Sequence, residues 1–208
     1  MNKPSEAPDI AQVLEHNRTL LYRHIAPRLV LALMLSAVPF VAHVVSREAD
    51  LPAFYAPAAV LVLIFLVLRL RHGSRFKVCE KVLHTYPLEY RTRVSKKDTE
   101  WKYLGDVHTV RLSVRGQHGA PSLRAINAST VRRWPKEAEE GGAWFAGDLA
   151  FGGVMIVPGS NDMLFVQPAD WEKYKQERAQ ADPQRRALAE RAGISGLLEK
   201  EPNIVVYG

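Results

Sequence analysis

The chain of 208 residues has one cysteine, Cys79, so it contains no internal disulfide and no zinc site built from several thiolates. It also lacks the G-x-G-x-x-G dinucleotide motif, the G-x-S-x-G motif of serine hydrolases and the H-E-x-x-H metal motif. The sequence therefore carries no motif of these common enzyme classes. A lone cysteine is typical of a reducing compartment, and we expect a free structural thiol.

Charge is scarce in residues 29–68, where the acidic and basic side chains all lie in the short link 47–50. The link separates two apolar runs, residues 29–46 and 51–68. Each run would form a helix about 27 Å long, close to the roughly 30 Å of a bilayer core. Neither run has the polar stripe of a helix at the surface of a soluble core. We expect a transmembrane hairpin, with 47–50 as its extracytoplasmic link.

Basic residues flank this hairpin on one side, and they predict its orientation. Cytoplasmic flanks of membrane spans are enriched in arginine and lysine. The sequence therefore predicts a protein of the cell (plasma) membrane with both termini in the cytoplasm, where its function should also reside. The membrane-flanking residues are Arg23, Arg28, Arg69, Arg71 and Arg75.

Residues 1–28 are expected to form a cytoplasmic tail with an amphipathic helix. Asp9 can cap the helix, and Val13, Leu14 and Leu21 recur at helical spacing. Such a helix can lie on the anionic inner leaflet or pack on the C-terminal domain. The nearby arginines favour the leaflet.

Residues 76–168 are expected to form a β-rich cytoplasmic domain. A helix before Pro87 leads into short segments of alternating polarity, separated by turn residues. These predict a small antiparallel sheet, either a half-open barrel or a sandwich. The predicted strands are residues 88–95, 108–114, 122–128, 143–147, 152–158 and 163–168.

Residues 169–208 are expected to form two helices and a terminal edge strand. The first helix begins near Asp170; the second begins at Pro183 and ends before Gly193. The predicted fold class is an α+β membrane protein, in which a helical hairpin is followed by an antiparallel sheet and C-terminal helices.

The spacing of Gly147 and Gly152 matches the ends of a phosphate-binding loop, but the lysine and hydroxyl that should follow are absent. We therefore interpret these glycines as turn residues. Asp148 and Asp162 also suit turns. An alternative assigns them, with His108, to the acid and base roles of a membrane-bound hydrolase or transferase, which requires the three to converge.

Metal and cofactor sites are not predicted. Three histidines, His84, His108 and His118, are scattered along the chain without ligand spacing. The net charge of +6 is shared between the membrane flanks and the domain, and no basic face with interleaved aromatics is evident. We expect no nucleic-acid partner.

The function predicted from these features is non-enzymatic. Two helices hold an interaction module at the membrane, as a subunit or regulator of a membrane complex or as an immunity-type inhibitor. Binding of anionic lipid by the β domain is a further alternative, and a homo-oligomer is left open. Aromatic residues lead interface hot spots, and the candidates are Trp101, Tyr103, Trp134 and Trp171.

The layout of a membrane hairpin, a short β domain containing "WFAGDLAFGGVMIVPGSNDMLFVQP" and an Arg/Ala-rich helical tail resembles small uncharacterised actinobacterial membrane proteins. It is also similar to bacterial proteins in which a hairpin precedes a pleckstrin-homology-like domain. The resemblance implies a plasma-membrane location and no catalytic activity.

Overall fold

The computed structural model describes residues 6–23, 26–27, 30, 34, 75–102, 105–113, 121–129 and 134–195, with the backbone alone for 100–102 and 105–106. No helix within these ranges is long and apolar enough to cross a bilayer. The predicted spans 29–46 and 51–68 lie outside the described residues, apart from positions 30 and 34.

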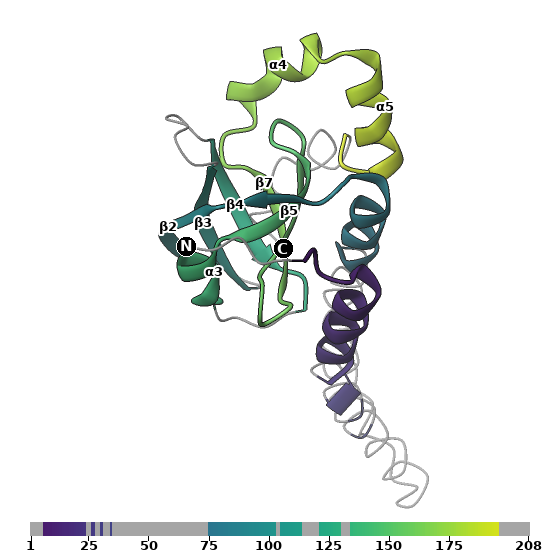
Figure 1. Ribbon diagram of the computed structural model, residues 1–208, viewed down its shortest axis with the longest axis vertical. Coiled ribbons are helices and arrows are strands. Elements are labelled where there is room, and N and C mark those ends of the chain that lie inside the picture. The colour runs from purple at the N-terminus through teal and green to yellow at the C-terminus, as the bar shows by residue number, and fades with distance from the viewer. Residues whose placement is uncertain are drawn as a thin grey trace, which may run out of the picture.

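A seven-stranded sheet forms the centre of the domain, and each strand is antiparallel to its neighbours (Figure 1). Its order is β1-β5-β6-β7-β4-β3-β2. Helices accompany the sheet, so the predicted α+β class is confirmed. The strands are β1 (Glu89–Arg91), β2 (Arg93–Lys102), β3 (Gly105–Ser113), β4 (Ser122–Asn127), β5 (Ala143–Asp148), β6 (Gly152–Ile156) and β7 (Met163–Pro168).

The sheet curls into a half-barrel because of how the chain passes from β1 to β2. These strands stand at opposite ends of the strand order, yet only Thr92 separates them in the sequence. The two ends of the sheet must therefore meet at Thr92. After Thr92 the chain continues as β2, which pairs with β3 and contacts helix α3 (Glu137–Gly141).

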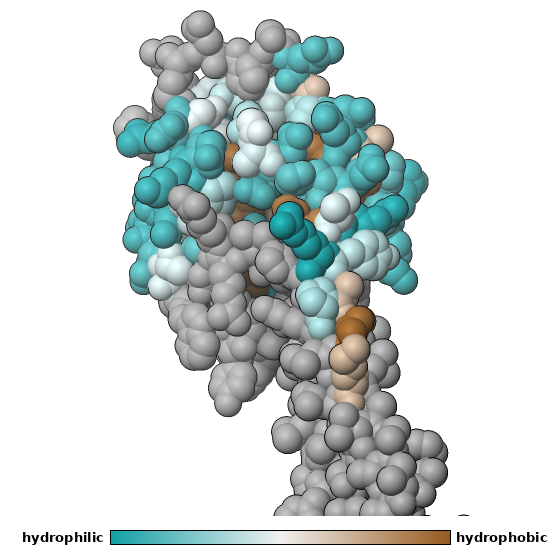
Figure 2. Space-filling model, turned by 90° about the horizontal axis from the view of Figure 1, so that it is seen from below, coloured by the Kyte–Doolittle hydropathy of each residue, from teal (hydrophilic) through white to brown (hydrophobic). Residues whose placement is uncertain are grey.

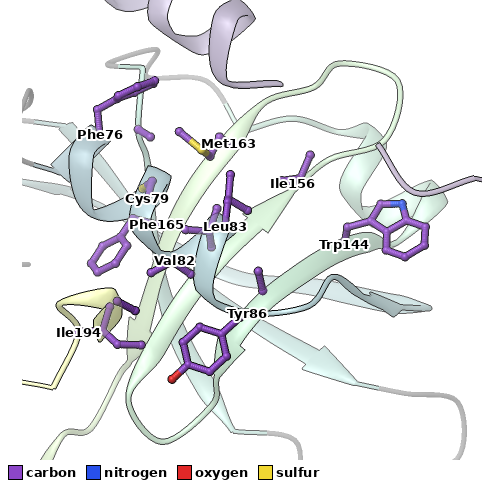
Figure 3. Packing of buried hydrophobic residues seen from close by; sticks show 14 of the residues in the cluster. Phe76, Cys79, Val82, Leu83, Tyr86, Trp144, Ile156, Met163, Phe165 and Ile194 are labelled. Carbon is purple, nitrogen blue, oxygen red and sulfur yellow. The ribbon is translucent and has the colours of Figure 1, made fainter. Parts of the chain in front are cut away.

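Two apolar clusters lie on the two faces of the curled sheet. The inner cluster fills the curl with side chains such as Val110, Phe145 and Val166. The outer cluster joins the sheet to helices of residues 10–23 and 75–85 and to the C-terminal helices. Figure 3 shows Phe76, Cys79 and Val82 of the second helix near Met163 and Phe165 of β7. Strands β6 and β7 are consequently buried on both faces.

The helix of residues 10–23 packs on the β domain. Asp9 caps it as predicted, since its carboxylate accepts the Ala11 amide at 2.9 Å. Val13, Leu14 and Leu21 are buried in the outer cluster. The preference for the inner leaflet was therefore wrong, because the apolar stripe covers the sheet.

Asn17 fixes the position of this helix through hydrogen bonds to the turn between β6 and β7. Its side chain is fully buried, and its amide donates to the carbonyl oxygens of Val13 and Asn161 at 2.8 and 2.7 Å. Its oxygen accepts the Met163 amide at 3.2 Å. Asn161 has a φ of 57°, in the left-handed region that asparagine tolerates. One side chain thus satisfies backbone groups 144 and 146 residues away in the sequence.

The stretch containing Gly147 and Gly152 forms the β5–β6 hairpin, as the turn interpretation predicted. Gly147 has a φ of 138°, and a Cβ atom there would lie 2.5 Å from the Gly152 carbonyl oxygen. Only glycine allows this approach of the two backbones. The β-strand after Gly152 confirms the predicted strand at residues 152–158, which ends two residues earlier than expected.

The C-terminal helices differ in part from the prediction. The helix from Pro183 is α5 (Pro183–Ala192), which ends before Gly193 as expected, with Gly193 in the left-handed region. Asp182 caps its start by accepting the Arg185 amide at 2.9 Å. The segment after Asp170 instead forms a 3₁₀ turn, η1 (Glu172–Tyr174), and a short α4 (Lys175–Gln180). The predicted terminal edge strand lies outside the described residues.

We predict that Asn17→Ala destabilises the domain by about 3 kcal/mol, because it leaves buried backbone groups of Asn161 and Met163 without partners. Thermal unfolding of the full chain in detergent should show a melting temperature lowered by roughly 5–10 °C. Gln12→Ala removes an exposed amide from the same helix and is the matched control. Equal melting temperatures for the two variants would contradict the role of Asn17.

Candidate functional site

Polar side chains from three parts of the chain lie close together at the turn between β5 and β6. Asp148 ends β5 and shapes the turn, because one of its carboxylate oxygens accepts the Ala150 amide at 2.9 Å. The Phe151 amide donates to the Asp148 carbonyl oxygen at 3.1 Å. The carboxylate side chain is only 10% exposed. It is therefore placed at a sharp bend, close to the protein interior.

Arg185 of α5 holds this carboxylate through two hydrogen bonds. Its Nε lies 2.7 Å from one oxygen of Asp148, and an Nη lies 3.0 Å from the other. This two-point pairing raises the pKa of Arg185, chiefly through the hydrogen bonds to Asp148. A second acid, Glu177, lies 3.4 Å from the same guanidinium in a more exposed position. The Asp148 carboxylate is thus engaged on both oxygens.

Tyr86, just past the helix of residues 75–85, adds a phenol near this pair. Burial and, to a smaller extent, the nearby charge of Asp148 raise the pKa of Tyr86 to about 12, against the opposing effect of Arg185. The phenol is therefore neutral at physiological pH. Figure 3 places its ring at the end of the helix, among the apolar side chains of the outer cluster.

Arg178 of α4 ties the C-terminal helices to the same turn. It donates to the carbonyl oxygens of Ala150 at 3.2 Å and Trp171 at 2.8 Å. Its guanidinium also lies 3.3 Å from the centroid of the Trp171 ring. This stacked arrangement is a cation–π contact, in which a half-buried indole carries a fixed positive charge on one face.

A cavity of about 370 Å³ opens beside this stack, between the turn, α4 and α5. Two aromatic rings contribute to its apolar part, and both basic and acidic side chains line it. Its lining is Phe151, Trp171, Glu172, Lys175, Arg178, Ala179, Arg186, Glu190 and Ser195. A mixed lining of this kind suits binding of a polar group with an apolar portion.

The predicted acid and base candidates do not converge. Asp162 lies in the β6–β7 turn, where its carbonyl oxygen accepts the Val157 amide. Asp148 pairs with Gly152 at the other end of β6, about 17 Å away along the strand. Burial raises the pKa of Asp162. The two carboxylates therefore cannot act on one substrate group.

His108 is separated from Asp148 by the sheet itself. It lies two residues from Val110 on β3 and so shares its face, inside the curl, whereas Asp148 lies two residues from Ala146 and shares the outer face. The buried imidazole lies 3.0 Å from the Thr99 hydroxyl and packs edge-on against Trp134, with ring centroids 5.1 Å apart. No group of three possible metal ligands occurs in the described residues. His118 lies outside them.

The predicted interface aromatics have different environments. Trp134 belongs to the inner cluster and is 7% exposed, so its assignment as an exposed contact was wrong. Trp171 is half-buried beside the cavity. The side chains of Trp101 and Tyr103 lie outside the described part of the structure.

The basic residues beside the apolar runs are only partly described. Arg23 is exposed, and Arg75 is half-buried. Arg28, Arg69 and Arg71 lie outside the described residues. Cys79 is fully buried, and burial raises its pKa to about 12, which suits the free structural thiol that was expected.

Arg178, Arg185 and Tyr86 organise this site, and sequence reasoning did not single them out. The cap at Asp182 places Arg185 in the first turn of α5. The cap predicts where Arg185 lies on the helix. It does not predict which acid Arg185 binds, because Asp148 lies 37 residues earlier in the sequence.

The chain matches no protein-family model, no curated protein and no solved structure. The class that the fold and site define is a half-barrel α+β domain, with helices on its outer face and a mixed-charge cavity at its C-terminal helices.

We predict that Asp148 and Arg185 couple by about 1–2 kcal/mol in a double-mutant cycle with Asp148→Asn and Arg185→Gln. The control cycle combines the same Arg185→Gln with Glu177→Gln, an exposed pair for which the coupling should stay below about 0.5 kcal/mol. Free energies of unfolding in denaturant supply both values. Similar coupling energies in the two cycles would show that the two-point pairing stabilises the fold no more than an exposed ion pair does.

Proposed function

We propose that this chain is a non-enzymatic, membrane-anchored module that binds another protein at the cytoplasmic face of the cell membrane. The observation that carries the proposal is the docking of two helices on one face of the sheet. The helix of residues 10–23 precedes the apolar run 29–46, and the helix of residues 75–85 follows the run 51–68. Both runs therefore adjoin elements that are packed into the same outer cluster.

Contacts between the two helices support this arrangement. Arg18 of the first lies 3.5 Å from Glu80 of the second, and its guanidinium is 5.8 Å from the centroid of the Phe76 ring. The contact is exposed, so its energy is small, but it places the helices side by side. A hairpin that joins them would leave and re-enter the domain at neighbouring points.

Exposed apolar side chains support a lipid environment for the segment where the helix of residues 10–23 leads into the apolar run 29–46. In the described part of the chain, the large hydrophobic residues that are exposed are Tyr22, Val30 and Met34, at 63%, 51% and 62%. In Figure 2, the coloured residues of the narrow extension are mostly apolar, whereas those of the domain surface are mostly hydrophilic. Apolar groups gathered where the predicted span begins suit contact with acyl chains.

The geometry of the polar groups favours binding over catalysis. Asp148 is engaged by Arg185, Asp162 lies at the far end of β6, and His108 faces the inside of the curl. The cavity beside Trp171 instead offers an aromatic face with charged groups around it. Anchoring restricts such a site to a thin layer at the membrane, which raises its effective concentration for membrane partners.

The orientation is tested by cysteine labelling in intact cells. A membrane-impermeant maleimide should label Glu48→Cys, in the predicted link, without permeabilisation. Glu6→Cys, at the exposed N-terminal side, should be labelled only after permeabilisation. The native Cys79 should contribute little background, because it is buried and its pKa is about 12. Labelling of Glu6→Cys alone in intact cells would reverse the proposed topology.

Partner binding is tested by purification of the full chain from membranes in mild detergent. A second protein should elute with it in a fixed ratio. Trp171→Ala, which removes the aromatic wall of the cavity, should reduce that ratio roughly tenfold or more, as expected for a hot spot. The exposed neighbour Lys173→Ala should leave it unchanged. Elution of the chain without any protein in a fixed ratio would argue against an interaction module.

A further inference from the structure

Three arginines form a diagonal row on the outer face of β2, β3 and β4. Ser95 pairs with Arg111, and Arg93 lies two residues before Ser95 on the same face of β2. Arg111 in turn pairs with Ser122, and Arg124 lies two residues further along β4. Diagonal neighbours of this kind are about 7–8 Å apart. The register therefore brings Arg93, Arg111 and Arg124 into one line across three strands.

This row faces away from the interior of the domain. Val94, Leu112 and Leu123 alternate with the arginines and belong to the inner cluster, so the arginines lie on the opposite face. Arg93 and Arg111 are exposed, and Arg124 is half-buried. The helices of residues 10–23 and 75–85 cover β5, β6 and β7 instead. In Figure 1, β2 and β3 lie at the opposite end of the sheet from those helices.

The charges of the row are not balanced within the described part of the protein. None of the three guanidiniums makes an ion pair or hydrogen bond with a described side chain. Asp98 lies on this face, across Thr109 from Arg124, and its carboxylate accepts the Thr99 amide. The groups between the arginines are mostly hydroxyls, which hydrogen-bond without adding charge. They are Ser95, Thr109, Ser113 and Ser122.

We propose that the row of Arg93, Arg111 and Arg124 binds an extended acidic segment of a partner protein. Alternate residues of an extended chain project to the same side about 6.8 Å apart, close to the spacing of the row. Three carboxylates at alternate positions can therefore meet three guanidiniums, which pair well with carboxylates. The proposal rests on the proposed function only in taking the ligand to be a protein. It adds a second contact surface, distinct from the cavity beside Trp171.

Other polyanions fit this face less well. Single-stranded nucleic acid is held by aromatic side chains on which bases stack, and the described side chains of the row and its intervening positions include no aromatic. A lipid surface would first contact the end of the domain that carries the helices next to the apolar runs, and the row lies at the opposite end of the sheet.

The test measures binding of a fluorescent decapeptide of alternating Glu and Ser to the full chain in neutral-lipid nanodiscs. The wild-type chain should bind it at low salt, and binding should weaken as salt rises. The triple variant Arg93→Gln, Arg111→Gln, Arg124→Gln should lose roughly tenfold or more in affinity. A peptide with Gln in place of Glu should not bind.

The matched control is Lys77→Gln, Lys81→Gln, Arg191→Gln, which removes the same charge from exposed residues elsewhere on the domain. It should change the affinity less than twofold. Equal losses in the two triple variants, or no binding by the wild-type chain, would overturn the proposal. A larger effect of the arginine variant on anionic vesicles or on oligo-dT than on the peptide would also overturn it.

Failure here is distinguishable from failure of the proposed function. If the partner that elutes with the chain is retained undiminished by the arginine variant, the row is not its contact and the interaction module stands. Unchanged melting temperature of the variant verifies that the exposed substitutions leave the fold intact.

Discussion

The structure depends on one constraint, the burial of β6 and β7 on both faces. An antiparallel sheet can leave one face in water, but every residue of these two strands is buried. The inner face packs within the curl, and the outer face must be covered by other elements. The helices of residues 10–23 and 75–85 and α5 supply that cover with Val13, Val82 and Ala189. Segments remote in the sequence are thereby held against the same strands.

That constraint links the proposed anchor to the domain. A helix that covers an apolar face gains hydrophobic stabilisation, but it can slide or rotate unless polar groups set its position. Asn17 sets it here, because its amide meets backbone groups of the β6–β7 turn within hydrogen-bonding distance. The helix next to the first apolar run is therefore fixed in register with the centre of the sheet.

The β5–β6 turn plays the corresponding part for the C-terminal helices. Arg185 of α5 donates to the Asp148 carboxylate, and Arg178 of α4 donates to the Ala150 carbonyl oxygen. The tight hairpin thereby positions α4 and α5. This use of Asp148 removes it from acid–base chemistry, since its oxygens are already bonded. The conspicuous glycines nearby serve the close approach of two backbones, and most of the residues that line the cavity lie on η1, α4 and α5 instead.

Local patterns in the sequence determined most elements correctly. Alternation located the strands from residues 122 to 168, and cap residues located both ends of α5. The single strand predicted at residues 88–95 was wrong, because the chain forms two strands there, β1 and β2. Its end was also placed too early, because "KKDTEWK" lacks alternation and contains a bulge between Lys96 and Asp98. Helix α3 was missed because its five residues, rich in glutamate, are too short for a helical period.

The sequence by itself determined the α+β class, the strand positions, the apolar runs and the helix caps, because each depends on residues close together in the chain. Only the tertiary structure decided which carboxylate Arg185 binds, that Trp134 is core, that His108 and Asp148 lie on opposite faces, and that three arginines form a row. These facts depend on strand order and register. Both are set by how apolar faces pack across the whole domain, and no local pattern records them.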